Sequence, residues 1–337
     1  MPEAPKADQP TTRSPRPAKA SNLRGGIDLG GTKIQAIVID DAQTVMGQAR
    51  RPTPTKGGPQ DVVDAMAEVL NAAADAAGVT TSSLRGVGVG SPGVIDHKAG
   101  TVANAGNLPD WKDPFPVVSS LGGLLGTKVE VGNDVDTATQ GEFELGAATD
   151  YKSILGVFWG TGIGGGIILN GKPWFGRGAA GEIGHVVINE GGRRCTCGRR
   201  GCMEAYAGRM AMEIRARKLH DDGKKTDLFK IMEQRGRPRL TSGVWARAMD
   251  HDDDLAKELL DEAVVALGAG VGSCVNVLDI EAVVIGGGMG IRFGQPFVDR
   301  IEAAMIPHIL ASDRPPAVLL GALGDLGGAI GASLLIK

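Results

Sequence analysis

Short apolar runs punctuated by glycines open the patterned part of the chain. Four of these runs predict strands, at residues 27–29, at 34–39, around Val45 and at 86–96. The first two runs flank a Gly-Gly-Thr turn, which predicts a β-hairpin. Residues 59–78 carry apolar side chains on one helical face and end at Gly78, which predicts a helix. Strands, a helix and a further strand in this order predict an α/β unit with a mixed sheet.

A similar order returns in the second half of the chain. An apolar strand at 154–159, a glycine turn at 160–166 and a returning strand at 167–169 resemble the first hairpin. The remaining predicted elements are helices at 203–218, 253–279, 296–311 and 324–337 and strands at 281–286 and 317–320. The charged stretch at 219–254 is interpreted as a surface elaboration. No run of 18 apolar residues occurs, so no membrane-spanning helix is predicted.

Composition and charge narrow the class of protein. Of the 337 residues, 42% are apolar and 22% are charged, which is typical of a globular chain with its own core. The 36 basic and 39 acidic residues give a net charge of −3, which argues against attachment to nucleic acid or to a membrane surface through bulk charge. Residues 1–23 are rich in proline and lack an apolar stretch. They are predicted to be a disordered tail, too short and too proline-rich for a helix-turn-helix module.

Two glycine turns are candidate phosphate-binding loops. At 30–32 and 160–166 the small residues let backbone N–H groups converge on an anion, although a plain hairpin turn would explain either loop. Asp28 lies two residues before the first turn, where an acid beside a phosphate would hold a magnesium ion. A third glycine cluster, at 286–288, ends a predicted strand and suits a nucleotide base or ribose. The loop at 160–166 joins two strands, so it does not indicate a dinucleotide-binding fold.

Three cysteines and a histidine have the spacing of metal ligands. Cys195, Cys197 and Cys202 follow His185 closely, and three thiolates with one imidazole complete a tetrahedral zinc shell. Four protein ligands leave no open position, so this zinc would be structural. A disulfide or plain buried thiols are the alternatives, and a reducing cytoplasmic compartment disfavours a disulfide. Arginines interleave the cluster, as a solvated face or as a site for a phosphate partner, at positions 193, 194, 199 and 200.

Several acids and amides are candidate ligands for a sugar. Asn133 and Asp134 lie where a predicted strand meets a helix, which directs side chains into a cleft but also suits a helix N-cap. Glu182 and Glu204 flank the cysteine cluster, so a folded zinc knuckle would bring the two acids together. With Asn107, these side chains suit a polyol, whose hydroxyls need many hydrogen-bond acceptors.

Seven motifs along the chain form a recognisable set. They are DLGGTK (28–33), GVGSPG (88–93), NLPDW (107–111), GND (132–134), GTGIGGG (160–166), GEIGH (181–185) and CTCGRRGCMEAYAG (195–208). Together they resemble the ROK family, and within it the bacterial glucokinases, over about residues 25–337. The resemblance implies a two-lobed α/β fold of the actin-like or ribonuclease H-like ATPases, in the sugar-kinase/Hsp70/actin superfamily. The small lobe would span 24–133, with a C-terminal helix at 325–337 packing back on it, and the large lobe 134–324, with a zinc knuckle at 185–202.

The same resemblance implies a role for each candidate residue. Asp134 would be the general base that takes the proton from the primary hydroxyl of the sugar. The other hydroxyls would be held by Asn107, Asn133, Glu182, His185 and Glu204. Magnesium would lie near Asp28 and adenosine near Gly287, and the phosphates of ATP would lie on Gly30, Gly31, Thr32, Lys33, Gly160, Thr161, Gly162 and Gly164. Phosphoryl transfer needs chiefly in-line positioning and neutralisation of charge, which loops, a metal and one base supply.

These expectations combine into an ATP-dependent glucokinase that phosphorylates the 6-hydroxyl of glucose. One alternative is a kinase for fructose, mannose or N-acetylglucosamine, or one that uses polyphosphate as donor. A second is a sugar-sensing regulator without catalysis, for which the tail supplies no helix-turn-helix. A third is a lectin-like module, which would not need Asp134 beside phosphate loops. The expected partners are a sugar and ATP, with no nucleic acid and no membrane. The resemblance implies a dimer or tetramer, and the few, clustered cysteines indicate reduced thiols in the cytoplasm.

Overall fold

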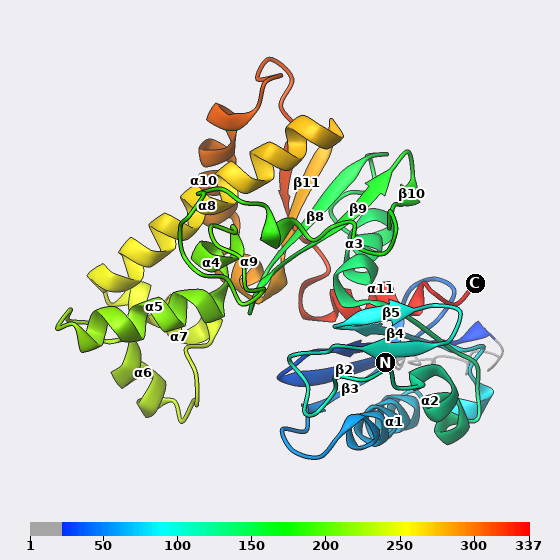
Figure 1. Cartoon of the computed structure of the whole chain (residues 1–337). Coiled ribbons are helices and arrows are strands. Elements are labelled where there is room, and N and C mark those ends of the chain that lie inside the picture. Colours follow the sequence, from blue (N-terminus) through cyan, green and yellow to red (C-terminus); the bar gives the residue numbers. More distant parts are fainter. Residues whose placement is uncertain (1–21) are drawn as a thin grey trace, which may run out of the picture.

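The computed structural model describes residues 22–337, and Figure 1 shows that α3 and α11 lie between its two large sheets. The N-terminal sheet has the strand order β3-β2-β1-β4-β7. Its strands are β1 (Arg24–Leu29), β2 (Lys33–Ile39), β3 (Val45–Pro52), β4 (Val87–Ser91) and β7 (Val129–Asn133). β1, β4 and β7 run parallel, whereas β2 is antiparallel to both of its neighbours. Helices α1 (Pro59–Ala76) and α2 (Val117–Leu125) pack on this sheet, and α1 covers β1, β2 and β3.

The C-terminal sheet repeats this plan with the order β10-β9-β8-β11-β12. Its strands are β8 (Ile154–Trp159), β9 (Ile163–Leu169), β10 (Lys172–Pro173), β11 (Ala282–Gly286) and β12 (Ala317–Leu320). The helices of this half are α4 (Glu204–Ala207), α5 (Arg209–Asp221), α6 (Leu228–Gln234), α7 (Ser242–Asp250), α8 (Asp254–Leu278), α9 (Gly287–Phe293) and α10 (Gln295–Met305). Within residues 22–337, α8 alone has the length and composition of a membrane span, but 61% of its apolar window is buried inside the protein.

Two helices connect the sheets through close backbone contacts. α3 (Asp134–Leu145) contacts β9 and β4, and α11 (Gly327–Ser333) contacts α3, β1 and β4. A Cβ on Gly88 of β4 would lie 1.7 Å from the carbonyl oxygen of Ala332. A Cβ on Gly331 would lie 1.9 Å from the carbonyl oxygen of Thr137 in α3. Glycine at both positions therefore allows α11 to lie directly on β4 and α3.

Two predicted segments differ from the structure in extent. The strand predicted at 86–96 is broken at Pro92 and Gly93, where φ is +100°, and β5 (Val94–Asp96) pairs with β6 (Thr101–Ala103) in a separate sheet. The glycine loop predicted at 160–166 is only three residues long, because β9 begins at Ile163 and pairs with Trp159. The returning strand is therefore longer than the predicted 167–169.

Three predicted helices are also shorter than expected. The helix predicted at 203–218 breaks at Gly208, whose backbone is extended (φ −60°, ψ 130°), into α4 and α5. The helix predicted at 296–311 is α10, which ends before a 3-10 turn at Ile306–His308, where Pro307 lacks the N–H that a continuing α-helix needs. The helix predicted at 324–337 is reduced to α11, after a 3-10 turn at Gly324–Leu326.

Buried side chains correct two further predictions, one for the charged stretch and one for the end of the N-terminal tail. The charged stretch at 219–254 is more than a surface elaboration, because α6 and α7 bury Leu228, Val244 and Trp245 in the main core of this half. Leu23, expected in the disordered tail, is only 2% exposed, and its carbonyl accepts a hydrogen bond from Arg85 N–H. The prediction for residues 1–21 lies outside the described residues.

Candidate active site

Asn133 and Asp134 mark the junction of β7 and α3. Asn133 is the N-cap of α3, because its Oδ1 accepts hydrogen bonds from the N–H groups of Val135 (2.9 Å) and Asp136 (3.2 Å). The capping role therefore falls on Asn133, whose side-chain NH2 group donates no hydrogen bond within residues 22–337. Asp134 is the first residue of the helix, and its Oδ1 accepts from Val135 N–H at 3.0 Å.

Carboxyl groups crowd together around Asp134. Desolvation, together with the nearby Asp28 carboxylate, raises the pKa of Asp134 to about 6, against the lowering effect of the Val135 N–H. Desolvation also raises the pKa of Asp136 to about 7, with Asp134 and Glu182 adding to the rise. Burial raises the pKa of Asp28, and the ammonium of Lys33 opposes that rise. A carboxylate with a pKa near 6 is ionised at neutral pH and basic enough to accept a proton from a bound hydroxyl.

The raised pKa of Asp136 predicts a pH-dependent gain in stability for the Asp136→Asn variant. The folded state binds more protons than the unfolded chain between about pH 4 and pH 7, so the free energy of unfolding falls as the pH rises through this window. The variant has no carboxyl group to ionise at this position, so its free energy of unfolding is expected to be about 1–2 kcal/mol higher than that of wild type at pH 8. Near pH 4 the two free energies of unfolding are expected to be equal. Urea unfolding at both pH values measures the effect. The exposed Asp150→Asn is the control, and a destabilised Asp136→Asn at pH 8 would contradict this account.

The two predicted phosphate loops each touch another part of the site. The turn at 30–32 lies against Asn107, because a Cβ on Gly31 would be 2.9 Å from the Asn107 Cβ. The loop at 160–162 lies beside the start of α9, where Gly287 has a φ of +79°. A Cβ there would be 2.5 Å from the carbonyl oxygen of Trp159. Glycine at position 287 therefore lets the start of α9 lie directly against the end of β8. The residues predicted to bind the nucleotide at these two places are thus neighbours.

Gly164 lies outside the loop in which it was predicted. It pairs with Phe158 inside the hairpin of β8 and β9, and a Cβ on it would lie 2.6 Å from the Val135 side chain of α3. Gly164 therefore lets the second hairpin approach the helix that begins at Asp134, instead of forming part of the turn.

Asp28 has the surroundings of a cation ligand. Its side chain forms no hydrogen bond with the described part of the chain, and a Cβ on Gly328 would lie 2.6 Å from its carboxyl carbon. Lys33 lies nearby, with its Nζ 3.7 Å from a carboxylate oxygen of Asp325. Because Mg²⁺ prefers oxygen ligands, the free carboxylate fits the predicted magnesium site. The sequence did not predict Gly328 or Asp325 as part of this site.

Arg209 is a second residue that the sequence did not indicate. Its Nη2 donates to Thr161 Oγ1 at 2.7 Å, and its Nη1 donates to the carbonyl of Leu240 at 2.9 Å. The N–H groups of Arg209 and Met210 donate to the carbonyls of Gly160 and Thr161 at 3.1 and 3.0 Å. The start of α5 therefore holds the loop at 160–162 from two directions.

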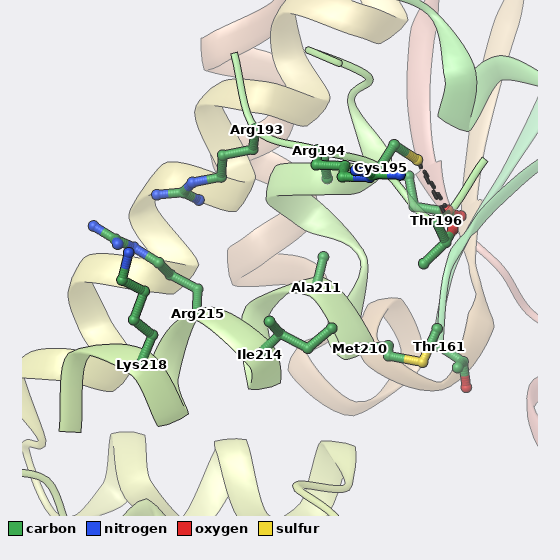
Figure 2. A pocket seen from close by; sticks show the side chains of 12 residues that line it. Thr161, Arg193, Arg194, Cys195, Thr196, Met210, Ala211, Ile214, Arg215 and Lys218 are labelled. Carbon is green, nitrogen blue, oxygen red and sulfur yellow. Dashed lines mark hydrogen bonds between the residues drawn. The ribbon is translucent and has the colours of Figure 1, made fainter. Parts of the chain in front are cut away.

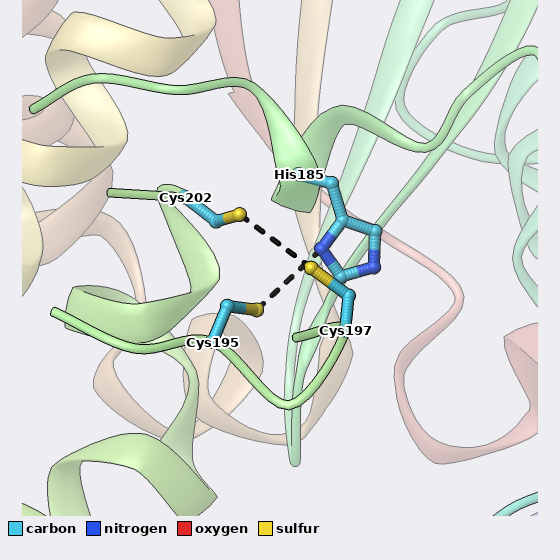
Figure 3. Close-up of side chains that lie close together, drawn as sticks. All are labelled: His185, Cys195, Cys197 and Cys202. Carbon is cyan, nitrogen blue, oxygen red and sulfur yellow. Dashed lines mark hydrogen bonds between the residues drawn. The ribbon is translucent and has the colours of Figure 1, made fainter. Parts of the chain in front are cut away.

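The structure brings the four predicted zinc ligands together (Figure 3). Their ligand atoms all lie within 4.8 Å of one another. His185 Nδ1 is 3.7 Å from Cys195 Sγ, and Cys197 Sγ is 3.7 Å from Cys202 Sγ. These separations equal the edges of a tetrahedron around zinc with Zn–S bonds of about 2.3 Å. The other ring nitrogen of His185 lies 3.8 Å from a carboxylate oxygen of Glu182, so this histidine connects the cysteines to a predicted sugar ligand.

Glu204 connects the zinc knuckle to the second glycine loop. Its Oε2 accepts from Ile163 N–H at 2.9 Å, and its Oε1 accepts from Thr196 Oγ1 at 3.1 Å. A Cβ on Gly162 would lie 2.3 Å from Oε2, so the glycine makes room for this carboxylate. Of the predicted sugar ligands, Glu182 and His185 contact each other, Asn107 lies at the first loop and is exposed, and Glu204 lies at the second loop.

Two sheets of this topology, each with a glycine turn in its first hairpin and connected by α3 and α11, define the fold of the actin-like ATPases and sugar kinases. The chain belongs to the ROK family, whose family model matches residues 24–337. The predicted fold class and family are therefore confirmed.

The relatives of the chain include proteins with two different sugar substrates in their names. The chain is 31% identical to the glucokinase of Thermotoga maritima, over 93% of this chain and 96% of that protein. It is 29% identical to an N-acetyl-D-glucosamine kinase of Escherichia coli, over 92% and 98%. The crystal structure of a ROK family glucokinase from Streptomyces griseus, in complex with glucose and AMPPNP, matches with a TM-score of 0.80 at 30% identity, over 93% and 98%.

Proposed function

We propose that the chain is an ATP-dependent glucokinase that transfers a phosphoryl group to the 6-hydroxyl of glucose. One observation carries this proposal: a desolvated carboxyl group with a raised pKa, that of Asp134, stands at the first position of α3 beside Asp28. Val135, the next residue, lies against the hairpin of the second glycine loop. A base next to a cation ligand and two anion loops is the set of groups that phosphoryl transfer needs. The similarity to named glucokinases over most of the chain supports glucose as the acceptor.

In the proposed reaction the chain binds, orients and deprotonates the sugar. Asp134 accepts the proton of the 6-hydroxyl, while the remaining hydroxyls are held by Asn107, Asn133, Glu182, His185 and Glu204. The turns at 30–33 and 160–162 hold the phosphates through backbone N–H groups, and adenosine lies near Gly287. Bound magnesium, held near Asp28, would neutralise phosphate charge. Lobes at 24–133 and 134–324, with residues 325–337 returning to the first, would close around both substrates and exclude water.

Hexose selectivity is the part of the proposal that a panel of substrates tests. The N-acetyl-D-glucosamine kinase among the relatives makes that sugar the second candidate. A coupled assay with ATP or polyphosphate and with glucose, mannose, fructose or N-acetylglucosamine is expected to give the highest kcat/KM for glucose with ATP. Preference for another hexose would overturn the glucose assignment and retain the kinase class. No phosphorylation of any hexose would overturn the kinase, and salt-dependent DNA binding would then favour the regulator.

Gly162→Ala is expected to weaken glucose binding about 10-fold to 100-fold. The new methyl group would occupy the position of Glu204 Oε2, so the carboxylate must leave its hydrogen bond with Ile163 and its place in the sugar site. A hydrogen bond to a charged group is worth about 1.5–3 kcal/mol. Calorimetric titration with glucose measures the change. Gly160→Ala is the matched control, because a Cβ there meets nothing within 4 Å, and equal glucose affinity in the two variants would contradict the role of Glu204.

The cellular setting is proposed from the same features. Thiols held as zinc ligands need a reducing compartment, so we place the protein in the cytoplasm. A homo-oligomer, dimer or tetramer, is proposed as the working form, with the sugar and ATP as the small-molecule partners and with neither nucleic acid nor membrane.

A further inference from the structure

A cavity of about 370 Å³ lies between the zinc knuckle and α5 (Figure 2). Its walls come from the loop that carries Cys195 and Thr196, from α4 and from one face of α5. Thr161 and Glu204 also line it, so the cavity reaches the proposed sugar site. A cavity of this volume accommodates a small organic ligand. The function proposed above leaves most of this space unused.

Four cationic side chains line the cavity: Arg193, Arg194, Arg215 and Lys218. Figure 2 shows the charged ends of Arg193, Arg215 and Lys218 on the same side of the cavity. Arg193 pairs with Glu262 at 2.7 Å, but Arg194, Arg215 and Lys218 have no ion pair within the described part of the chain. The Nε atom of Arg215 is buried and has no hydrogen-bond partner there. The like charges of Arg194, Arg215 and Lys218, which have no ion pair within residues 22–337, repel one another, and a bound anion would reduce that cost.

Part of the cavity lining is apolar. Ala205 of α4 and Met210, Ala211 and Ile214 of α5 line it, and Ile214 is 61% exposed. An anion alone would contact the cations and leave these apolar side chains exposed to water. A ligand with a charged end and a compact organic body would contact both the cations and the apolar side chains.

We propose that this cavity binds a small organic phosphate monoester, separate from the substrates of the active site. The guanidinium group of Arg215 and the ammonium of Lys218, which lie on the same side as the guanidinium of Arg193 in Figure 2, hold the phosphate, since planar guanidinium donors match phosphate oxygens. The body of the ester packs on Met210 and Ile214. Arg193 and Arg194, which also line the cavity, belong to the basic residues for which the sequence left a phosphate partner open.

The cavity is connected to the sugar site through Glu204, which lines the cavity and accepts hydrogen bonds from other residues that line it. Thr196 lines the cavity and donates to Glu204 Oε1 at 3.1 Å, while the other oxygen of Glu204 accepts from Ile163 N–H. Occupancy of the cavity thus changes the affinity for glucose, and by linkage glucose changes the affinity for the ester. This coupling rests on the proposed role of Glu204, whereas the binding of the ester does not.

Calorimetric titration of the full chain with glucose 6-phosphate, AMP and inorganic phosphate tests the site, in the presence of saturating glucose and AMPPNP. At least one ester is expected to bind, with its Kd raised tenfold or more in the double variant Arg215→Gln, Lys218→Gln. The double variant Lys225→Gln, Lys230→Gln removes the same charge from exposed positions nearby and is expected to leave the Kd unchanged. Circular dichroism and melting temperature check that both variants are folded.

Three results would overturn the proposal. Equal ester affinity in the two double variants would show that the cavity is not the site. If inorganic phosphate bound as tightly as both esters, the apolar side chains of the cavity would contribute nothing to the affinity. No ester binding, with a change of oligomeric state in the Arg215, Lys218 variant by sedimentation, would show that a second copy of the chain covers this face.

A separate titration tests the coupling. The ester that binds is expected to change the Kd for glucose at least threefold in wild type and not in the Arg215, Lys218 variant. An unchanged glucose Kd in wild type would overturn the coupling. Absence of glucose binding under all conditions would count against the proposed glucokinase instead, while ester binding that is lost in the double variant would still support the cavity.

Discussion

Replacing Asp134 by asparagine is expected to lower kcat by about two to four orders of magnitude, the range typical of a lost acid or base group. Asparagine has the same shape and keeps an oxygen that accepts from Val135 N–H, so the junction of β7 and α3 is expected to remain intact. It cannot accept the proton of the sugar hydroxyl at neutral pH. The Kd for glucose is expected to change only a few-fold, because the amide still hydrogen-bonds the hydroxyl. Steady-state kinetics and calorimetry measure the two effects separately.

Asp136→Asn is the matched control for this variant. Asp136 lies two residues further along α3, shares Glu182 as a neighbouring carboxylate with Asp134 and also has a raised pKa. Its replacement removes a similar charge without removing the base, so its kcat is expected to stay within about tenfold of wild type. If Asp136→Asn lost as much activity as Asp134→Asn, charge in this region and not the base at position 134 would explain the loss.

The pH profile gives a second readout of the same base. Because the pKa of Asp134 is raised to about 6, the carboxylate becomes protonated as the pH falls through 6. The kcat/KM of wild type is therefore expected to fall about tenfold per pH unit below this value. A profile that stays flat down to pH 5 would contradict an essential base with this pKa.

Removing the metal is expected to produce the second large effect. Cys202→Ser eliminates one of four ligands whose atoms already stand within 4.8 Å of one another, and the folding of the knuckle is linked to metal binding. The variant is expected to lose zinc, to melt about 10 °C lower and to bind glucose more weakly, since His185 and Glu204 are both positioned by this region. Elemental analysis, calorimetric melting and glucose titration measure these three quantities.

Cys274→Ser separates the metal from the general cost of replacing a buried cysteine. Cys274 is 8% exposed in α8 and lies outside the cluster. It is expected to retain one zinc per chain and normal glucose affinity, with only a small drop in melting temperature. Absence of zinc from the purified wild type, or zinc retained by Cys202→Ser at full stability, would contradict the structural zinc site.

Features with a local signature were the ones that the sequence could predict. The first hairpin follows from two apolar runs around a glycine turn, and the cysteine cluster follows from ligand spacing within a short segment. Asn133 and Asp134 were assigned to a strand-helix junction from the change of pattern, and the structure shows β7 ending and α3 beginning there. Which of the two caps the helix was decided by geometry, because both residue types suit that position.

Features that depend on distant backbone could not be predicted in this way. The break at Gly208 matches hydrogen bonds from Arg209 and Met210 to the carbonyls at 160 and 161, which no pattern within 203–218 reveals. Gly328 leaves room for the Asp28 carboxylate only because α11 returns to β1. Trp245 lies in a stretch dominated by charge, yet tertiary packing buries it completely. Each of these positions is determined by a partner far along the chain.

The most direct test of the central claim is a crystal structure of the wild-type chain with glucose and AMPPNP bound. We expect an Asp134 carboxylate oxygen within about 2.6–3.2 Å of the glucose O6, on the side facing away from the nucleotide. An O6 held by another side chain, with the Asp134 carboxylate beyond hydrogen-bond reach in the closed complex, would contradict the account.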